Sequence, residues 1–453
     1  MISMHQPGGS LRGRSLLALG LALAISSAAW AGNGGRIGAV GGVSINADGV
    51  VGQVDAQTRK ELRDLRLKEL QPVPPGLNQP VELRKISLRA IEQAVAASVK
   101  NLAAELPDEI RFLAGIQRIQ YVFIYPEQND IVLAGPGEGW KVDDNGSYVG
   151  VTTGRPVLRL EDLVVALRTV ENARQGGISV SIDPTAEGRQ QFERYMRTQK
   201  TFNPAVLGGI EKSLGQQQIS IKGIPATSHF ASVLVASDVR MKRIAMKLED
   251  SPVKGLPSFL DLLAKGGKLD NMMPRWWLAC NYEPLAKSED GLAWELRGSG
   301  VKVMTEEEVI GADGSVTGTG KVDPLAQKFS DLMTEKYDEL STAEPIFGEL
   351  RNMMDLCVIA ALISKENLFE KAELKLPTLL GQNDKLQVFA GHAPQTVATQ
   401  CSFVKRSREF LITASGGVDI TSWQVADKSV TDQAVKQVRS QAAAQAPGSL
   451  WWN

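Results

Sequence analysis

Residues that could carry acid–base or nucleophilic chemistry are few in this sequence, and histidine is the scarcest of them. The 453-residue chain has three histidines, and only His229 and His392 lie beyond the N-terminal segment. A Ser/His/Asp triad would have to use one of these two rings as its general base. His229 follows Ser228, where we expect it to share in capping a helix, whereas His392 lies in a loop before Pro394 and is the better functional candidate. We retain both as candidate ligand-binding residues.

Nucleophile motifs are missing from the sequence or poorly placed. No Gly-x-Ser-x-Gly elbow occurs. The pattern Ser-x-x-Lys occurs at Ser251 and Ser402, but Pro252 interrupts the first and the second lies in an expected strand. A glycosidase pair of carboxylates has no sequence signature, because only its separation in space matters. The catalytic residues are therefore unknown at this point, and whether the chain is an enzyme stays open.

Metal and cofactor motifs are equally weak. Neither Cys-x-x-Cys nor His-Glu-x-x-His occurs. The acidic run Glu306–Glu308 lacks the alternating oxygen ligands of a calcium loop, and we expect it to begin a helix after Thr305. The stretch Gly318–Lys321 is followed by Val322, where a nucleotide-binding loop needs Ser or Thr. We predict no metal and no cofactor.

A basic cluster is the first of two local features that could bind a ligand. Arg240, Lys242 and Arg243 lie in the last turns of an expected helix from about Ser228 to Leu248, where cations complement the helix dipole. A solvated helix end is the plainer interpretation, and an anion site is the alternative. No aromatic residues interleave with these cations and the formal net charge of the chain is −1, so we expect no nucleic-acid partner.

Paired tryptophans are the second feature. Trp276 and Trp277 lie in an expected strand, where neighbouring side chains face opposite sides of the sheet. One indole can then be buried while the other is exposed and stacks on a sugar or a peptide. Burial of both rings is the alternative. A second pair, Trp451 and Trp452, either docks in a groove or ends a disordered tail.

Cysteine usage adds little. Cys357 lies in an apolar helical stretch, and we expect it to be a buried free thiol. Cys280 and Cys401 both fall in expected strands and could pair. The sequence leaves that pairing open, because it does not show how far apart the two residues lie.

The elements that must position these residues indicate an α+β fold. From about residue 105, short strands alternate with helices, which predicts an α/β-layered core. Hairpins are expected around Asp48-Gly49 and between the runs 119–125 and 131–134. An amphipathic helix is expected over 86–102, and two apolar-striped helices between 325 and 361 predict an antiparallel helix pair. The part that follows is β-rich, and no internal repeat is evident.

The chain divides by composition into five segments. The first, residues 1–31, has arginines, an apolar run and a final Ala-Trp-Ala, which predicts a secretory signal peptide cleaved after Ala31. No later apolar run is long enough to span a bilayer, so we expect no integral membrane segment after cleavage. The other segments are a Gly-rich N-terminal segment with a helix and a Pro linker (32–80), an α/β domain (81–270), strands with the helix pair (271–425) and a polar C-terminal tail (426–453).

Five stretches are too particular to be generic. They are NDIVLAGPGEGW (129–140), TTGRPVLRLEDLVVALR (152–168), MMPRWWLACNYEPL (272–285), DGLAWELRGSGVKVMTEEE (290–308) and AEPIFGELRNMMDL (343–356). Together they resemble a family of secreted planctomycete proteins built around a domain of unknown function, over roughly residues 105–415. The resemblance implies export from a bacterium with a Gram-negative-like envelope. It assigns no catalytic or binding residue.

These observations favour an exported, non-catalytic protein that binds or scaffolds a component of the cell envelope, in a periplasm-like space or outside the cell. This expectation rests on the absence or poor placement of catalytic motifs and on the scarcity of histidine. One alternative is an extracytoplasmic hydrolase acting on peptide or glycan material, since two carboxylates in a cleft would suffice. Another is a self-assembling envelope component, in which the partner is a second copy of the chain.

Overall fold

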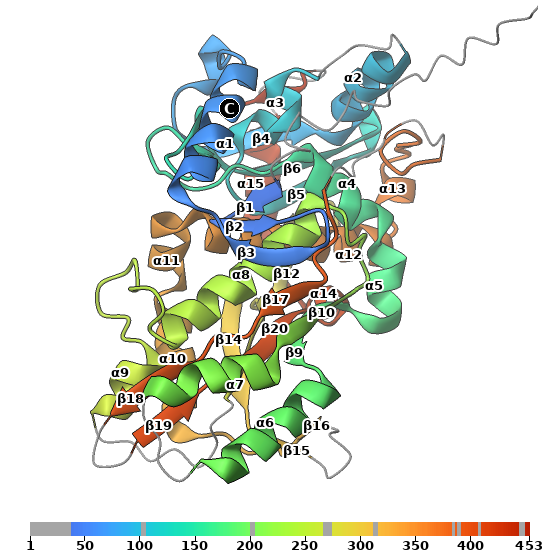
Figure 1. The fold of residues 1–453 in the computed structure, drawn as a ribbon. Coiled ribbons are helices and arrows are strands. Elements are labelled where there is room, and N and C mark those ends of the chain that lie inside the picture. The colour runs from blue at the N-terminus through green and yellow to red at the C-terminus, as the bar shows by residue number, and fades with distance from the viewer. Residues whose placement is uncertain are drawn as a thin grey trace, which may run out of the picture.

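A computed structural model describes residues 38–100, 106–199, 204–265, 274–310, 316–382, 386, 391–405, 409–443 and 449–453. The expected signal peptide, residues 1–31, lies outside the described residues. The fold is α+β, as expected, with two large sheets and helices packed on and between them. Figure 1 shows β17, β10, β9, β20 and β14 of the nine-stranded sheet in the lower half of the molecule, β1, β2 and β3 near its middle, and β4, β5 and β6 of the other sheet in the upper half.

The nine-stranded sheet is mixed and collects strands from most of the chain. Its order is β1-β2-β3-β17-β10-β9-β20-β11-β14. The bounds are β1 Gly38–Val40, β2 Val43–Ile45, β3 Val50–Gln53, β17 Thr396–Ala398, β10 Gln216–Lys222, β9 Ile178–Pro184, β20 Ser415–Ile420, β11 Arg275–Asn281 and β14 Gly300–Glu306.

The seven-stranded sheet has the order β21-β12-β13-β5-β6-β4-β22. The bounds are β21 Ser429–Thr431, β12 Leu285–Lys287, β13 Ala293–Glu295, β5 Tyr121–Tyr125, β6 Asp130–Gly137, β4 Val81–Ser87 and β22 Trp451–Trp452. Three two-stranded ribbons complete the strands. They are β7 Trp140–Val142 with β8 Tyr148–Gly150, β15 Glu308–Ile310 with β16 Val316–Gly318, and β18 Ser402–Lys405 with β19 Glu409–Ile412.

Helices fill the space between and beside the sheets. The bounds are α1 Ala56–Glu69, α2 Leu88–Lys100, α3 Asp108–Arg111, α4 Leu160–Arg168, α5 Val170–Gly176, α6 Ala186–Thr198, α7 Leu207–Leu214, α8 His229–Ala245, α9 Phe259–Ala264, α10 Pro324–Glu335, α11 Tyr337–Ala343, α12 Pro345–Lys365, α13 Leu368–Lys371, α14 Ser422–Ala426 and α15 Gln433–Ala443. Helix α8 packs on β9, β11 and β20, and also on α12, which is buried along nearly its whole length. None of the helices in the described ranges combines the length and apolarity that crossing a bilayer requires.

Both sheets contribute to one continuous apolar core. Ile86 and Val122 of the seven-stranded sheet belong to the same buried cluster as Val180 and Trp276 of the nine-stranded sheet. Strands from both sides of residue 270 pair within each sheet. At ~25 cal/mol per Å² of apolar surface removed from water, such a core is the main stabilising contribution.

Several local predictions are confirmed. Both expected hairpins form, as β2–β3 and β5–β6. The expected helix start at Ser228 is confirmed, since its side chain accepts a hydrogen bond from the backbone N–H of Ala231 at 3.1 Å. The expectation that His229 shares in this cap is wrong, because its ring contacts Asp162 instead. Trp276 is fully buried while Trp277 is half-buried, as strand alternation predicts. The C-terminal Trp451 and Trp452 form β22, which pairs with β4 in the seven-stranded sheet.

Other predictions are wrong for identifiable reasons. Glu306 ends strand β14 instead of beginning a helix, because the alternating residues before it pair with β11 along the whole strand. Ile86 belongs to β4, and the amphipathic helix begins only at Leu88, after Ser87 accepts a hydrogen bond from the N–H of Ala90. The first helix of the expected pair ends at Glu335 and restarts as α11, and it is α11 that packs on α12.

The cysteines do not pair. Cys280, Cys357 and Cys401 are all free and buried. Cys280 lies in β11, whereas Cys401 belongs to a separate apolar cluster that includes Phe192 of α6. The expected buried thiol at Cys357 is confirmed, and a Cys280–Cys401 disulfide is not formed.

Candidate functional site

One face of the nine-stranded sheet is polar and accessible. Along β9, Val180 is buried while its neighbours Ser179 and Ser181 are half-buried, and the same alternation continues through β11 and β14. The buried set faces α8 and α10, since Trp276 packs edge-on against Phe329 of α10. The polar set therefore lies on the opposite face.

Strand register arranges this polar face in three rows. β10, β9, β20, β11 and β14 are adjacent in that order, so their paired residues stand side by side. The first row is Lys222, Ser179, Asp419, Ala279 and Lys302, and the second is Ser220, Ser181, Gly417, Trp277 and Met304. Arg275 and Glu306 are paired in the third row.

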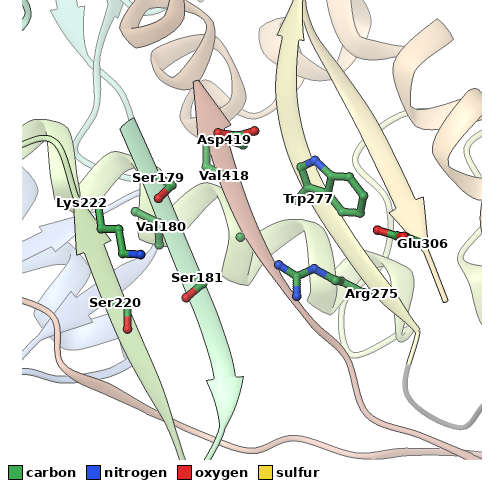
Figure 2. A pocket seen from close by; sticks show the side chains of 11 residues that line it. Ser179, Val180, Ser181, Ser220, Lys222, Arg275, Trp277, Glu306, Val418 and Asp419 are labelled. Atoms are coloured by element: carbon green, nitrogen blue, oxygen red, sulfur yellow. The ribbon is translucent and has the colours of Figure 1, made fainter. Parts of the chain in front are cut away.

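A pocket of about 480 Å³ occupies the middle of this face. We call it the sheet-face pocket. Its lining residues are Ser179, Val180, Ser181, Ser220, Lys222, Arg275, Trp277, Glu306, Gly417, Val418 and Asp419. Figure 2 shows the side chains of Lys222 and Arg275 pointing toward each other from opposite sides, across the strands that carry Ser181 and Val418. The floor between them consists of small side chains.

The sheet-face pocket is lined by two cations and two carboxylates, and each of these four groups has different surroundings. Lys222 is exposed, and in the described part of the chain no carboxylate forms an ion pair with it. The guanidinium of Arg275 lies 5.8 Å from the centre of the Trp277 ring. Glu306 accepts a hydrogen bond from the N–H of Gly320 at 2.8 Å, whereas burial raises the pKa of Asp419.

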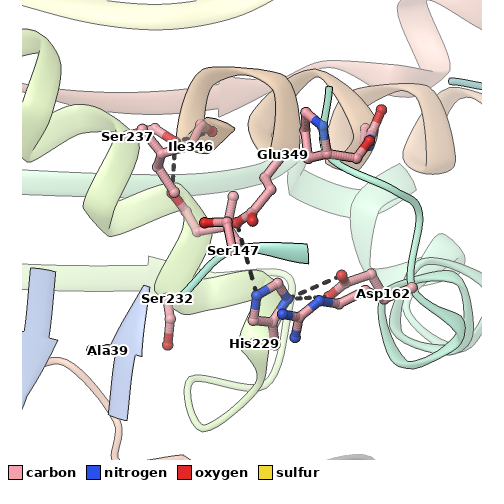
Figure 3. A network of polar contacts seen from close by, with 12 residues as sticks. Ala39, Ser147, Asp162, His229, Ser232, Ser237, Ile346 and Glu349 are labelled. Carbon is pink, nitrogen blue, oxygen red and sulfur yellow. Dashed lines mark hydrogen bonds and ion pairs between the residues drawn. The ribbon is translucent and has the colours of Figure 1, made fainter. Parts of the chain in front are cut away.

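A second polar group lies inside the core around His229 (Figure 3). Its Nδ1 is 3.0 Å from both carboxylate oxygens of Asp162, and its Nε2 is 4.0 Å from Oε2 of Glu349. The Asp162 and Glu349 side chains are 1% and 7% exposed, and that of His229 is 10% exposed. We call these three residues the His229 group. The ring thus bridges two carboxyl groups that come from α4 and α12.

Burial controls the protonation of the His229 group. It raises the pKa of Asp162 to about 7 and that of Glu349 above its usual range. Burial, together with the nearby cation of Arg159, lowers the pKa of His229 to about 4. The imidazole is therefore neutral near pH 7. Within the described ranges, no hydroxyl group hydrogen-bonds to Nε2, which faces the carboxyl group of Glu349 instead.

The basic side chains of α8 form ion pairs within the protein. Arg240 pairs with Glu249 and Glu344 at 2.8 Å each. Lys242 pairs with the buried Asp238 at 2.6 Å. Both cations are therefore already paired with carboxylates of the protein.

The third cation is paired as well. The Arg243 guanidinium lies 3.0 Å from Glu249 and donates to Gln400 and to the carbonyl of Leu248. Arg240 and Arg243 therefore link α8 to other segments, and Lys242 pairs within α8, so the three cations do not form an open site.

The structure does not bring the sequence-derived candidates together. Trp277 is the one that lies in the sheet-face pocket, while His229, Arg240, Lys242 and Arg243 are on α8, across the sheet from it. Trp276 is buried in the core, and His392 is exposed in the segment before β17. Asp162, which holds His229, carried no sequence signal.

Most residues of the sheet-face pocket were missed from sequence. Lys222, Arg275, Glu306 and Asp419 are ordinary charged residues at strand positions. A usable signal is present in β9, where serines alternate with Ile and Val, because serine on the open side of a strand marks a face without apolar packing. This alternation shows which face of β9 lacks apolar packing, but it does not show which strands lie next to β9.

One family model matches part of the chain. It is described as a protein of unknown function (DUF1598), and it covers residues 180–259. That stretch contains most of β9, all of β10 and the whole of α8, so it contributes one side of the sheet-face pocket and the helix behind the sheet. Neither the curated proteins nor the solved structures gave a match.

Proposed function

We propose that this chain is a non-catalytic binding protein of the cell envelope that holds a polar ligand in the sheet-face pocket. One observation carries the proposal. Lys222 and Arg275 face each other over a floor of small side chains, with the half-buried Trp277 beside them (Figure 2). Concave sites with a few convergent polar groups are typical of small-molecule binding.

The carboxylates of the pocket support binding over hydrolysis. Asp419 pairs with Ala279 of β11, whose partner on β14 is Lys302, four residues before Glu306. At ~4.8 Å between strands and ~3.3 Å per residue, the Cα atoms of Asp419 and Glu306 are ~16 Å apart. Glycosidases place their two carboxyl groups ~5–9.5 Å apart. These two residues are therefore poorly placed to act as a hydrolytic pair.

The His229 group also fits a structural role better than a catalytic one. A triad needs a nucleophile at the free nitrogen of the imidazole. In His229 that nitrogen faces Glu349, and the whole group is within the core. We infer that it fixes α4, α8 and α12 relative to one another.

Export remains part of the proposal. The support for it is the leader pattern of residues 1–31, with its apolar run and the small residues before the cleavage position. The partner that we propose is an envelope component.

A thermal-shift panel tests the proposed function. Saccharides, amino acids, short peptides, nucleotides and organic acids are each added to the protein and to Ser181→Leu, in which a larger side chain fills the pocket floor. Gln216→Leu on the exposed side of β10, outside the pocket, is the matched control. We expect at least one class to raise the Tm of the wild type and the control but not of Ser181→Leu. The proposal is wrong if no class raises the Tm of the wild type, or if Ser181→Leu responds equally.

A further inference from the structure

We propose that the ligand of the sheet-face pocket is a zwitterion, a free α-amino acid with an apolar side chain. This inference rests on the proposed function and names the ligand class for the same site. It is carried by three side chains that line the pocket: the carboxylate of Asp419, the ammonium group of Lys222 and the indole of Trp277.

The carboxylate of Asp419 is half-buried in the wall of the pocket. Among the residues that the structure describes, none donates a hydrogen bond to this side chain or forms an ion pair with it. Burial therefore raises the pKa of Asp419 without a donor to offset it. Partly buried carboxylates usually accept hydrogen bonds, so this acceptor suits a donor that arrives with a ligand. An ammonium group is such a donor, and it adds the attraction between opposite charges.

Lys222 supplies the opposite charge at a suitable distance. In the strand register Asp419 pairs with Ser179, and Ser179 pairs with Lys222, so the Cα atoms of the two charged residues are ~9.6 Å apart. Figure 2 shows the Lys222 side chain reaching toward the middle of the pocket. With hydrogen bonds of ~2.8 Å at each end, the adjacent ammonium and carboxylate groups of one α-amino acid fit between these two side chains. The hydroxyl of Ser179, between them, both donates and accepts.

The other charges of the pocket favour a ligand without net charge. Two cations and two carboxylates line it. A simple anion is repelled by Asp419 and Glu306, and a simple cation is repelled by Lys222 and Arg275. A zwitterion pairs with Lys222 and Asp419 and adds no net charge. Arg275 keeps its contact with the ring of Trp277, 5.8 Å from the ring centre, and does not hold the ligand.

Trp277 favours an apolar side chain on the ligand. Asp419 pairs with Ala279, and Trp277 lies two residues before Ala279, so the Cα atoms of Trp277 and Asp419 are ~8 Å apart. An aromatic side chain reaches across such a diagonal. The half-buried indole of Trp277 lines the pocket there. A leucine or phenylalanine side chain, attached next to the ammonium group at Asp419, removes apolar surface from water by packing on this ring.

A neutral saccharide is the main competing ligand. Its hydroxyls could also bond to Asp419 and Ser179, and its ring could pack on Trp277. It would bring no counter-charge to Asp419 or to Lys222, whereas an amino acid brings one to each. The pocket therefore favours the amino acid.

Isothermal titration calorimetry with L-leucine and L-phenylalanine tests the inference. The matched ligands are the N-acetyl derivative of each amino acid, which lacks the ammonium charge, its amide, which lacks the carboxylate, and glycine, which lacks the side chain. We expect at least one of the two amino acids to bind. Its derivatives and glycine should bind at least about tenfold more weakly, because each loses one charged hydrogen bond or the apolar contact.

Variants show whether binding uses the pocket. Asp419→Asn and Lys222→Met should each weaken binding about tenfold. Asp183→Asn and Lys212→Met, at an exposed lysine of α7, should leave binding unchanged. Asp183 is a close match for Asp419 because it is also half-buried, and it lies on the same side of β9 as Ser181 but outside the pocket lining. Lys222 is exposed, so its variant keeps the test valid even if Asp419→Asn lowers stability.

The outcomes separate the two proposals. Derivatives that bind as tightly as the parent amino acid, or an unchanged affinity in Asp419→Asn or in Lys222→Met, overturn the amino-acid inference. If neither amino acid binds but a saccharide or another class of the thermal-shift panel binds in the pocket, the inference is wrong and the proposed function stands. If nothing binds to the wild type, both are wrong.

Discussion

His229 and Asp162, which are 67 residues apart in the sequence, meet with Nδ1 3.0 Å from each carboxylate oxygen. Burial pushes their pKa values in opposite directions, to about 4 for the imidazole and about 7 for the carboxyl group. In the unfolded chain near pH 5.5 the imidazole carries a proton and the carboxyl group does not. In the folded protein the proton is on Asp162 instead, so the number of protons bound by the pair is the same in both states.

This exchange predicts that Asp162→Asn makes stability more pH-dependent. Of the pair, only the lowered pKa of His229 then remains, and the raised pKa of Glu349 is common to both proteins. Relative to the wild type, the unfolded state of the variant therefore binds more protons between about pH 4 and pH 6.5. The free energy of unfolding should fall by roughly 2 kcal/mol more than in the wild type as pH drops through that window. Urea titrations at pH 4, 5, 6 and 7 measure this difference.

Substitution of the other residue of the pair, His229→Gln, should change the pH dependence of the free energy of unfolding in the opposite direction, and it serves as the control. In His229→Gln only the raised pKa of Asp162 remains of the pair, and that of Glu349 is again common to both proteins. Relative to the wild type, the folded state of the variant therefore binds more protons between about pH 4 and pH 7. Its free energy of unfolding should fall, relative to the wild type, as pH rises through that window. Parallel pH profiles for the wild type and both variants would contradict the exchange.

Arg84 is expected to be one of the most sensitive positions in the fold. Its side chain is fully buried, donates to three backbone carbonyls and to the side chain of Asn453, and lies 6.0 Å from the ring of Trp451. The carbonyls belong to Leu77, Gln79 and Ala114. Arg84→Met should destabilise the protein by about 3–5 kcal/mol, because these acceptors stay buried without a donor.

Chemical denaturation measures that loss. Arg194→Met removes an exposed arginine that donates to the carbonyl of Gln190 in its own helix, so it should change stability by less than about 0.5 kcal/mol. Equal stability of the two variants would show that Arg84 does not hold the C-terminal strand.

Two glycines should respond to alanine in opposite ways. Gly416 has φ 141°, and a Cβ there would overlap the carbonyl oxygen of Trp276 on the neighbouring strand, so Gly416→Ala must distort β20. Gly208 lies inside α7 with nothing near its missing Cβ. Gly208→Ala should stabilise by up to about 1 kcal/mol. Thermal unfolding of both variants decides this, and a stable Gly416→Ala protein would contradict the geometry of β20.

The three cysteines should be unreactive in the native state. Burial raises the pKa of Cys280 and of Cys401 to about 12 and that of Cys357 well above its usual range, which keeps all three as thiols. A thiol-specific disulfide reagent at pH 8 should label none of them in the folded protein and all three in denaturant without reductant. Fewer than three labels in denaturant would reveal a disulfide.

Local geometry could be predicted from the sequence. The period of two in β11 predicts that Trp276 and Trp277 face opposite sides, and Asp48-Gly49 predicts a hairpin, because these depend on neighbours along the chain. Ser228 was expected at the start of a helix for the same reason, and it caps α8.

At Glu306, strand pairing overrides the local preference of the sequence. A carboxylate run after Thr305 suits a helix start, yet pairing of β14 with β11 holds it in a strand. Helix propensity and dipole effects of ~0.3–1 kcal/mol are weaker than a seven-residue ladder with one buried side.

The sequence by itself determined the α+β class, the caps and turns, and which side chains of each strand share a face. Only the tertiary structure decided which strands stand side by side, and so placed Lys222, Asp419 and Arg275 in one pocket and Asp162 against His229. The physical reason is that periodicity depends on bonded neighbours, whereas pairing across the sheet and compensation of buried charge depend on residues distant in the chain.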